Sequence, residues 1–486
     1  MAIVDIPYYH RSLNWNDFVR KFPPPAEFES SVYRWGRDEI RRLQETRFLE
    51  AMEIGWGNAF YQRIWKQAGL EPRDIKGLDD LHKLPIVSSE DFKIEIEEAP
   101  PWGEHQGITP EGARHKPLKI QTSGGTTGKP RPTFFGPIEW ELNGMSAARA
   151  LFVQGARPGD VMQIPMTCYT GNAGWSYYLA CHNWLGIVPL TTGAGSVTPS
   201  RRQLEFARDW GTNLWLAGAY HVQLAKTAQE ELGFDVRDLN TKFLHAFLGP
   251  DESGEFRAAL EDLWGCEVYD NYGTHEIGLP AFECREKSGL HLQEDLGYTE
   301  VVDSKTGQPV DAESGEIGDL VYTSFYREHP PLIRYNLKDR MRFVDYGQQC
   351  ACGSYLLRRD HHMGRSDDMV KLRATNVYPE ACQDAVNSDP RTTGEYLCVV
   401  ENVKDEKGVQ LSEEMTVKVE YRDATVDKKD FKRVLEARLK ADLGVRVAVE
   451  PVSTGTLAEY TSVDGSEIKK RRLLDLRAAQ QDSEKT

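Results

Sequence analysis

Apolar residues follow helix-like spacing at the start of the chain and then alternate between helix-like and strand-like spacing. Residues 39–66 carry apolar and aromatic positions every three or four residues, which predicts a helical N-terminal segment. Ser88-Ser89-Glu90-Asp91 has the residue types that cap a helix start, so a helix is predicted there after a short extended piece at 84–87. Further on, helices are predicted at 138–152 and 175–184, and strands at 161–165, 187–190, 214–217, 243–247 and 267–269. This alternation predicts a predominantly parallel sheet covered by helices on both faces.

Strand-like segments dominate the next part of the chain. Segments 296–302, 319–324 and 341–344 predict a barrel-like or antiparallel subdomain. After Arg365 the character changes to a helix at 380–387, strands at 396–400, 415–421 and 445–449, and a helix at 428–443 that Gly444 ends. We therefore predict an α/β protein with a large N-terminal domain, 1–366, and a small α+β domain, 367–486.

Composition and charge narrow the class of protein. The chain has 486 residues, 40% of them hydrophobic, which is enough for a sizeable core and more than one domain. A net charge of -16 argues against nucleic acid or an anionic membrane as a general partner, although a local basic pocket for a nucleotide stays compatible. There is no signal-peptide core at the N-terminus and no run of eighteen apolar residues, so we expect a cytoplasmic protein without membrane spans. Its eight cysteines are then expected to be thiols or metal ligands.

The stretch from Ile120 to Pro130 concentrates glycines and hydroxyls more densely than a core could use. It predicts a phosphate cradle in which glycines let the backbone approach an anion, hydroxyls donate hydrogen bonds and a lysine supplies charge. These residues are Thr122, Ser123, Gly124, Gly125, Thr126, Thr127, Gly128 and Lys129. A Walker-type loop fits less well, because Ser123 stands in place of its first glycine and Pro130 in place of its Ser or Thr. Pro130 and Pro132 also disfavour the helix that follows a Walker-type loop, so an extended segment is predicted at 131–135. A flexible surface loop is the other alternative.

Three cysteines and a histidine predict a metal site. Cys284 and His291 flank Gly289, and Cys350-Ala351-Cys352-Gly353 resembles a metal knuckle in which closely spaced thiolates share one ion. Zinc is the natural occupant, and it would stabilise the β-rich subdomain without taking part in chemistry. The alternative is four unconnected residues.

Together with four later stretches, the cradle resembles the adenylate-forming acyl-CoA synthetases, most closely their phenylacetate-CoA ligase branch. The resemblance covers nearly the whole chain, and its motifs occur in the family's order. The later stretches are Tyr269-Asp270-Asn271-Tyr272-Gly273-Thr274-His275-Glu276, Pro331-Leu332-Ile333-Arg334-Tyr335 running to Asp339, Gly364-Arg365-Ser366-Asp367-Asp368, and the basic run ending Arg472-Leu473-Leu474-Asp475-Leu476-Arg477.

The resemblance implies a role for each motif. The cradle, with Lys129, would hold the ATP phosphates, Tyr272 would stack on adenine, Glu276 would bind magnesium, and Asp339 would hold the ribose hydroxyls. Arg365 would contact ribose or phosphate. Other residues implied to line the nucleotide are Gly249, Pro250, Asp251, Asn271, Gly273, Thr274 and His275, the last standing where the family usually has Ser or Thr.

The implied chemistry has two steps. A substrate carboxylate attacks the α-phosphate of ATP, giving an acyl-adenylate and pyrophosphate, and a thiol then attacks the activated carbonyl. The first step depends on positioning and on charge neutralisation by magnesium and a lysine. The resemblance points to Lys469, three residues before Arg472, with Lys470 as the alternative, and to Asp367 as the hinge of the small domain.

An aromatic acid is the predicted substrate. Several aromatic side chains lie in the segment where the family builds its acyl pocket, and a flat acid would suit them. The predicted pocket residues are Tyr169, Trp175, Tyr178 and His245. The leading hypothesis is an AMP-forming ligase that joins this acid to coenzyme A. The alternatives are an adenylating enzyme that passes the acid to an amine or carrier protein, and a silent nucleotide-binding scaffold; the family also suggests a homodimer.

Overall fold

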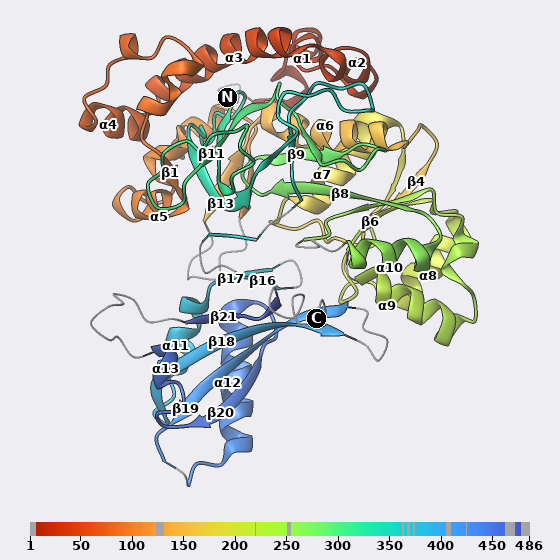
Figure 1. Cartoon of the computed structure of the whole chain (residues 1–486), viewed down its shortest axis with the longest axis vertical. Helices are drawn as coiled ribbons and strands as arrows, with labels where there is room; N and C mark the ends of the chain where they lie inside the picture. The colour runs from red at the N-terminus through yellow and green to blue at the C-terminus, as the bar shows by residue number, and fades with distance from the viewer. Residues whose placement is uncertain are drawn as a thin grey trace, which may run out of the picture. The chain divides into compact units, whose positions relative to one another are not determined.

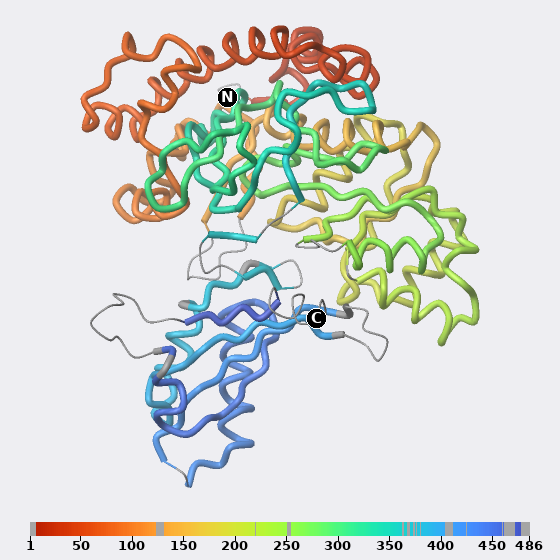
Figure 2. Tube along the Cα trace, in the orientation of Figure 1, coloured from red at the N-terminus to blue at the C-terminus, as the bar shows by residue number. Residues whose placement is uncertain are grey.

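The computed structural model describes residues 6–122, 131–218, 220–249, 254–361, 364–366, 370–372, 375–404, 410–423, 425–461 and 472–477. Its contacts divide the chain into two compact units. The first unit consists mainly of Met1–Ser123 and Pro132–Ser366, and the main body of the second is Asp367–Thr486. Figure 2 traces the chain through both units from the N-terminus to the C-terminus. Each unit is described separately.

A nine-stranded mixed sheet forms the centre of the first unit (Figure 1). Its parallel half consists of β5 (Val188–Leu190), β4 (Val161–Gln163), β6 (Leu214–Ala217), β7 (Phe243–Ala246) and β8 (Glu267–Thr274). Its antiparallel half continues through β9 (Gly278–Glu283), β10 (Leu290–Leu292), β15 (Arg358–Arg359) and β14 (Phe343–Val344). The predicted parallel sheet is therefore confirmed for one half, and the antiparallel extension is an addition to the prediction.

Helices cover the parallel strands on both faces, as the uninterrupted apolar run of β6 requires. Leu214 and Leu216 of β6 belong to one core cluster with α6 (Pro137–Gln154) and α7 (Ala173–Leu179). Trp215 instead contacts His221 of α9 (Tyr220–Thr227) and Trp264 of α10 (Glu255–Trp264). Figure 1 shows α8 (Ser200–Trp210) beside α9 and α10. Gly144 lets α6 and α7 pack closely, since a Cβ there would lie 2.5 Å from the Leu179 Cβ atom.

A second sheet and the N-terminal helices complete the first unit. The sheet has the order β1 (Val87–Ser88), β13 (Tyr335–Met341), β12 (Gly318–Ser324) and β11 (Gly297–Val302), antiparallel except that β1 pairs parallel with β13. The helices are α1 (Trp15–Lys21), α2 (Pro25–Ser30), α3 (Arg37–Gly57), α4 (Ala59–Gln67) and α5 (Ser89–Glu98). Ser88 and Asp91 form the predicted capping box at the start of α5.

The second unit is a small α+β fold. Its sheet has the order β20 (Ala448–Ser453), β19 (Gln410–Tyr421), β18 (Thr392–Lys404) and β21 (Leu473–Asp475). The other elements are β16 (Val370–Leu372), β17 (Thr375–Val377), α11 (Cys382–Asn387), α12 (Lys428–Leu443) and α13 (Ala458–Thr461). Asp427 caps α12, one face buries Phe431, Leu435, Leu439 and Leu443, and Gly444 ends the helix with φ of 67°. The predicted bounds of α12 are confirmed.

Three predicted elements differ in kind from the observed ones, and the strand predicted at 445–449 is observed further along, as β20 at Ala448–Ser453. The single helical segment at 39–66 is two helices, because Asn58 leaves the helical conformation and caps α4 through the Tyr61 N–H. The helix predicted at 175–184 ends as α7 at Leu179 and continues as a π-helical turn over Ala180–Leu185. The strand predicted at 341–344 is wrong, since Met341 ends β13 and Phe343–Val344 belongs to the other sheet.

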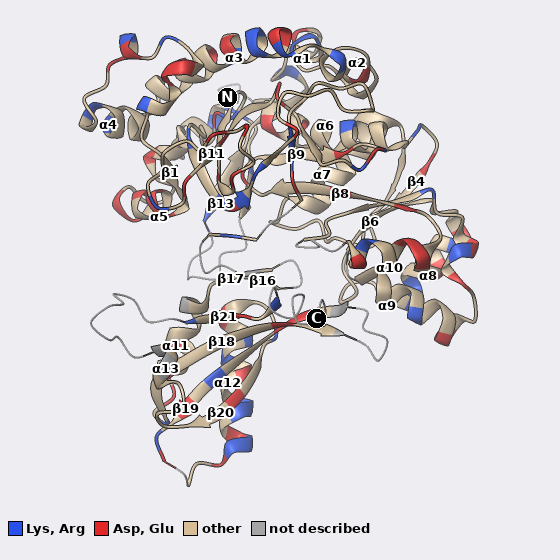
Figure 3. Cartoon of the chain, in the orientation of Figure 1, with Lys and Arg blue, Asp and Glu red and all other residues tan. Residues whose placement is uncertain are grey.

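Charged side chains of both signs are mixed along the surface helices, as Figure 3 shows for α3. Within the described residues, no helix combines the length and the apolar character needed to cross a membrane. All eight cysteines lie in this part of the chain, and none of them forms a disulfide. The α/β fold class is confirmed.

Candidate active site and metal centre

A two-stranded hairpin leads into and out of the predicted phosphate cradle. Strands β2 (Lys119–Thr122) and β3 (Pro132–Phe135) pair antiparallel, and Thr122 stands opposite Pro132. Thr122 donates its N–H to the Thr170 carbonyl over 2.8 Å and its hydroxyl to the Thr170 hydroxyl over 3.0 Å. The extended segment predicted after the cradle is thus β3. Ser123, Gly124, Gly125, Thr126, Thr127, Gly128 and Lys129 lie outside the described residues, as do Pro250, Asp251, Asp367, Lys469 and Lys470.

Three predicted nucleotide residues meet although they come from three distant stretches. The Tyr272 hydroxyl donates to Asp339 Oδ2 over 2.5 Å, and Arg365 NH1 lies 2.8 Å from Asp339 Oδ1. Burial raises the pKa of Tyr272 well above its ordinary value, and the neighbouring Asp339 charge raises it further, so the phenol stays protonated and donates. Tyr272, Asp339 and Arg365 are called the nucleotide cluster below.

Arg359 belongs to the same neighbourhood, and the sequence offered no signal for it. Its guanidinium carbon lies 3.8 Å from the centroid of the Tyr272 ring, and its Nε donates to the Asp360 carbonyl. Arg359 is fully buried. One face of the Tyr272 ring is therefore occupied by a cation, and stacking on adenine has to use the remaining face or the ring edge.

The other residues of the motif at the end of β8 are of two kinds: some hold the backbone, and some could bind a ligand. Asn271 donates to the Ala246 and Tyr269 carbonyls and so holds the backbone of β7 and β8. A Cβ at Gly273 would lie 2.8 Å from the Gly278 carbonyl, which explains the glycine. The buried Thr274 hydroxyl has no hydrogen-bond partner among the described residues, and the half-buried Glu276 follows it in the turn before β9. A hydroxyl and a carboxylate of this kind fit a hydrated magnesium ion and a phosphate.

His275 belongs to the same motif, and Gly249 follows the neighbouring strand β7. The His275 ring is half-buried and meets Phe135 edge to face at 6.1 Å. Gly249 follows β7 with φ of +72°, a conformation that favours glycine. The preceding N–H, that of Leu248, donates to Asp270.

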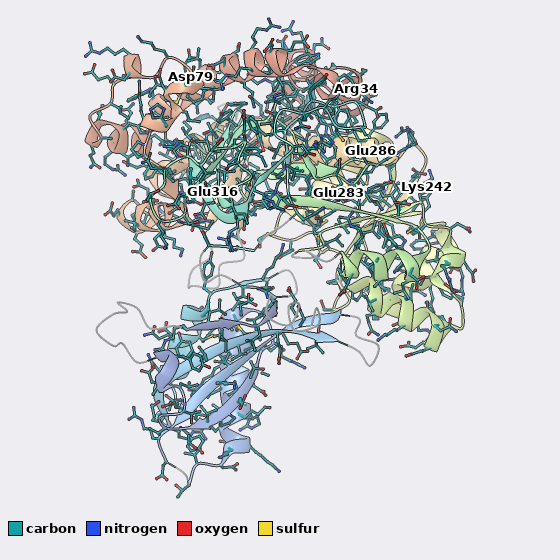
Figure 4. The ribbon with its side chains drawn as sticks, viewed as in Figure 1. Arg34, Asp79, Lys242, Glu283, Glu286 and Glu316 are labelled. Atoms are coloured by element: carbon teal, nitrogen blue, oxygen red, sulfur yellow. The ribbon has the colours of Figure 1, made fainter. Side chains whose placement is uncertain are left out.

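A network of charged side chains connects β8 and β9 through the buried residues Asp270 and Glu283. Glu283 accepts from Arg257 over 2.8 Å and from the Asp270 N–H over 2.6 Å, and His361 Nδ1 lies 2.9 Å from Asp270 Oδ2. Figure 4 labels Glu283 on β9. Burial raises the pKa of Glu283; at His361 burial opposes the charge, but the hydrogen bond with Asp270 raises the pKa overall.

The predicted substrate residues fall into two groups. Trp175 contacts Trp140 at 5.9 Å, Lys119 lies 5.0 Å from the Trp175 centroid, and the indole N–H donates to the carbonyl of the exposed Tyr169. Tyr178 stacks on His182 at 5.4 Å. Together these side chains form an aromatic group beside the hairpin.

His245 is separate from this group. It is fully buried, its Nε2 lies 2.6 Å from the Tyr177 hydroxyl, and its Nδ1 lies 2.6 Å from Gln154 Oε1. Burial lowers its pKa to about 3. Both ring nitrogens are therefore used inside the core, and this arrangement indicates a packing role for His245.

The four predicted metal ligands come together in the antiparallel half of the sheet. One ligand atom from each of Cys284, His291, Cys350 and Cys352 lies within 4.8 Å of all the others. The Cys284 and Cys350 sulfurs are 3.9 Å apart, and Cys352 Sγ is 3.5 Å from His291 Nε2. A tetrahedral zinc with bonds of about 2.3 Å to sulfur places its ligands about 3.8 Å apart, so this set, called the metal cluster below, fits zinc.

Comparison with known proteins agrees with the fold. The family described as AMP-binding enzyme C-terminal domain matches residues 374–477, in the second unit. A phenylacetate-coenzyme A ligase of Aromatoleum evansii is 26% identical over 93% of this chain and 99% of its own, and one of Thermus thermophilus is 29% identical over 75% of this chain and 79% of its own. The solved structure of a 2-hydroxyisobutyryl-CoA ligase, with 24% identity, covers 96% of this chain and 97% of its own at a TM-score of 0.82, which shows the fold.

The two-unit fold and the C-terminal match make the chain similar to the adenylate-forming enzymes. Along most of its length the chain is similar in sequence to phenylacetate-coenzyme A ligases such as these two relatives.

Proposed function

We propose that the chain is an ATP-dependent, AMP-forming ligase that activates an aromatic carboxylic acid as acyl-adenylate and transfers the acyl group to coenzyme A. The observation that carries this proposal is the nucleotide cluster, in which a tyrosine, an aspartate and an arginine from three motifs meet. An aspartate can accept hydrogen bonds from the two ribose hydroxyls, and an arginine can pair with a phosphate. Relatives named for phenylacetate and coenzyme A support the acid class and the acceptor.

The proposed roles follow the two domains predicted from the sequence. Residues 1–366 would bind ATP through the cradle and Arg365, and the acid near Trp175. Residues 367–486 would supply Lys469 for adenylation and turn about Asp367 for the second step. The chemistry balances: the acid oxygen displaces pyrophosphate from the α-phosphorus, and the thiol then displaces AMP from the acyl carbon.

Magnesium would be held through Glu276 and would neutralise phosphate charge when bound. The Thr274 hydroxyl, two residues earlier in the same motif, supports this placement, because a buried hydroxyl without a described partner needs one. Glu276→Gln should raise the magnesium concentration required for pyrophosphate release, since the amide lacks the charge that holds the ion. An unchanged magnesium dependence would mean that a residue other than Glu276 holds the ion.

Zinc is the second proposal, and it is supported by the ligand separations of the metal cluster. The site has four protein ligands and hence no open position, which is typical of structural zinc. We also propose a cytoplasmic location, where cysteine thiols stay reduced, and a homodimer. Sedimentation of the purified protein would test the dimer.

The test of the proposed function is a panel of acids. We expect pyrophosphate release with phenylacetate or benzoate and thioester formation only when coenzyme A is added. A branched hydroxy acid such as 2-hydroxyisobutyrate is the comparison substrate. Products with an amine in place of coenzyme A would favour the amide synthetase, and no pyrophosphate with any acid would favour the silent scaffold.

A further inference from the structure

The segment Val32–Arg37, called the docking segment here, lies directly on the metal cluster, although it is more than 200 residues away in sequence. The Tyr33 hydroxyl lies 3.0 Å from Cys352 Sγ, and Tyr33 is 1% exposed. The Tyr33 ring stacks on Phe282 at 6.3 Å and meets the ring of the ligand His291 at 5.5 Å. A fixed, dry phenol therefore points at one of the four proposed metal ligands.

Two arginines of the docking segment bind the chain at the knuckle and just after it. Arg34 donates to the Cys352 carbonyl and lies over the Tyr33 ring, and Figure 4 labels it in the N-terminal layer. Gly353 has φ of +88°, and a Cβ there would lie 2.6 Å from Arg34 NH1, so the glycine permits this approach. Arg37 donates to the Tyr355 carbonyl over 3.1 Å and forms a bidentate pair with Glu294.

We infer that Tyr33 is an outer-sphere hydrogen-bond donor to the Cys352 thiolate, and that it couples metal occupancy to the docking of this segment. The inference rests on the zinc proposal. A metal-bound thiolate carries no hydrogen, so it can only accept, and the phenol has to donate. Such a bond neutralises part of the thiolate charge and holds the ligand in place, which slows its dissociation from the metal.

The helix before this segment contacts Tyr33 through Phe28, at 5.8 Å between ring centroids, but it also has anchors away from the metal cluster. Phe28 of α2 is fully buried and lies under the guanidinium of Arg149, which donates to the Pro23 carbonyl. Arg149 also pairs with the buried Asp295. Loss of the metal should consequently loosen residues 32–37 more than residues 23–30.

The first test compares Tyr33→Phe with Tyr61→Phe. Tyr61 is a matched control, because it is equally buried and donates to the Pro331 carbonyl over 3.0 Å, away from the metal cluster. Zinc transfer from the purified full chain to an excess of a chromogenic chelator is followed over time. We expect Tyr33→Phe to release zinc about tenfold faster than the wild type, and Tyr61→Phe to release it at the wild-type rate.

The second measurement uses the wild type alone. Hydrogen exchange before and after chelation should show faster exchange at residues 32–37 and little change at 23–30. A wild-type release rate in Tyr33→Phe, or unchanged exchange at 32–37 after zinc removal, overturns the inference while zinc itself stands. A wild-type protein that holds no zinc even when supplied with it overturns the zinc proposal and this inference together, whereas the ligase assay is unaffected.

Discussion

The metal cluster and the nucleotide cluster are both assembled from distant stretches of the first unit, but they differ in completeness. The metal cluster offers four ligand atoms within 4.8 Å of one another, three of them on buried residues. The nucleotide cluster offers only part of what adenylation needs. The groups proposed to bind the ATP phosphates come from residues 122–129, and the proposed catalytic lysine, Lys469, comes from the second unit. A structural ion is held best by a complete set of protein ligands. A reaction in two steps instead requires that some catalytic groups act in one step and move away for the next.

Lys469→Ala should give the largest effect on the reaction and none on the metal. A preorganised charge at the transferring phosphate is worth several kcal/mol, so adenylation should slow by about 10² or more. Thioester formation from a supplied acyl-adenylate should stay near the wild-type rate, and the zinc content should not change. The two half-reactions are measured separately by pyrophosphate release and by thioester absorbance.

Two variants serve as controls for Lys469. Asp367→Pro should mainly slow the second half-reaction, because proline stiffens the proposed hinge. Lys470→Ala should behave as wild type. Equal losses in both half-reactions for Lys469→Ala would indicate a structural role, and a normal first step would pass the assignment to Lys470.

Cys350→Ala should have the largest effect on stability. Removing one of four ligands should abolish stoichiometric zinc and lower Tm by on the order of 5 °C or more, because metal binding contributes directly to folding free energy. Cys181→Ala is the matched control, since it removes another buried thiol of the first unit and should leave one zinc per chain. Elemental analysis and thermal unfolding with and without chelator give both values; equal zinc contents in the two variants would contradict the site.

Asp339→Asn should weaken ATP binding by an intermediate amount. The amide keeps an acceptor for Tyr272 but loses the charge that faces Arg365, so the KM for ATP should rise by roughly tenfold. Asp319→Asn, a fully buried carboxylate on the neighbouring strand β12, is the control and should change Tm without changing this KM. The opposite pattern would remove Asp339 from the nucleotide site.

His361→Gln should give the smallest effect, a change in the pH dependence of stability. The pairing with Asp270 raises the pKa of His361 above its ordinary value of about 6.5, so its contribution is complete below that pH and declines as pH rises through the folded-state pKa. The variant should therefore lose stability mainly near pH 6 and less at higher pH. As a result, its Tm should change less with pH from about 6 upward than the Tm of the wild type. Exposed His115→Gln should leave the profile unchanged.

Local signals in the sequence were sufficient for much of this fold. Leu214–Ala217 is a short apolar run between Asn213 and Gly218 and forms β6 as predicted, and Gly444 ends α12. The strand Tyr335–Met341 was not predicted, because Lys338, Asp339 and Arg340 interrupt its apolar positions and long-range pairing with β12 and β1 stabilises it instead. Tertiary pairing of this kind leaves no periodic signal.

In the candidate sites, too, the sequence did not indicate contacts between residues that are far apart in the chain. The Cys-x-Cys-Gly knuckle suggested which residues could bind metal, and the structure places its members together. Tyr33, Arg359 and His361 were missed, because a buried tyrosine or arginine has no characteristic spacing to the residue that it contacts. His245 was interpreted as a substrate residue, but its two partners, Tyr177 and Gln154, are 68 and 91 positions away.

The central claim is that the acid is activated as an acyl-adenylate, and isotope transfer tests it most directly. The protein is incubated with ATP, coenzyme A and phenylacetate whose carboxylate carries ¹⁸O, and AMP is analysed by mass spectrometry. Attack of the carboxylate on the α-phosphate, followed by thiol attack on the acyl carbon, leaves one carboxylate oxygen on AMP, so we predict ¹⁸O-labelled AMP in step with thioester. Thioester formed with unlabelled AMP, or with ADP as the nucleotide product, would contradict the account.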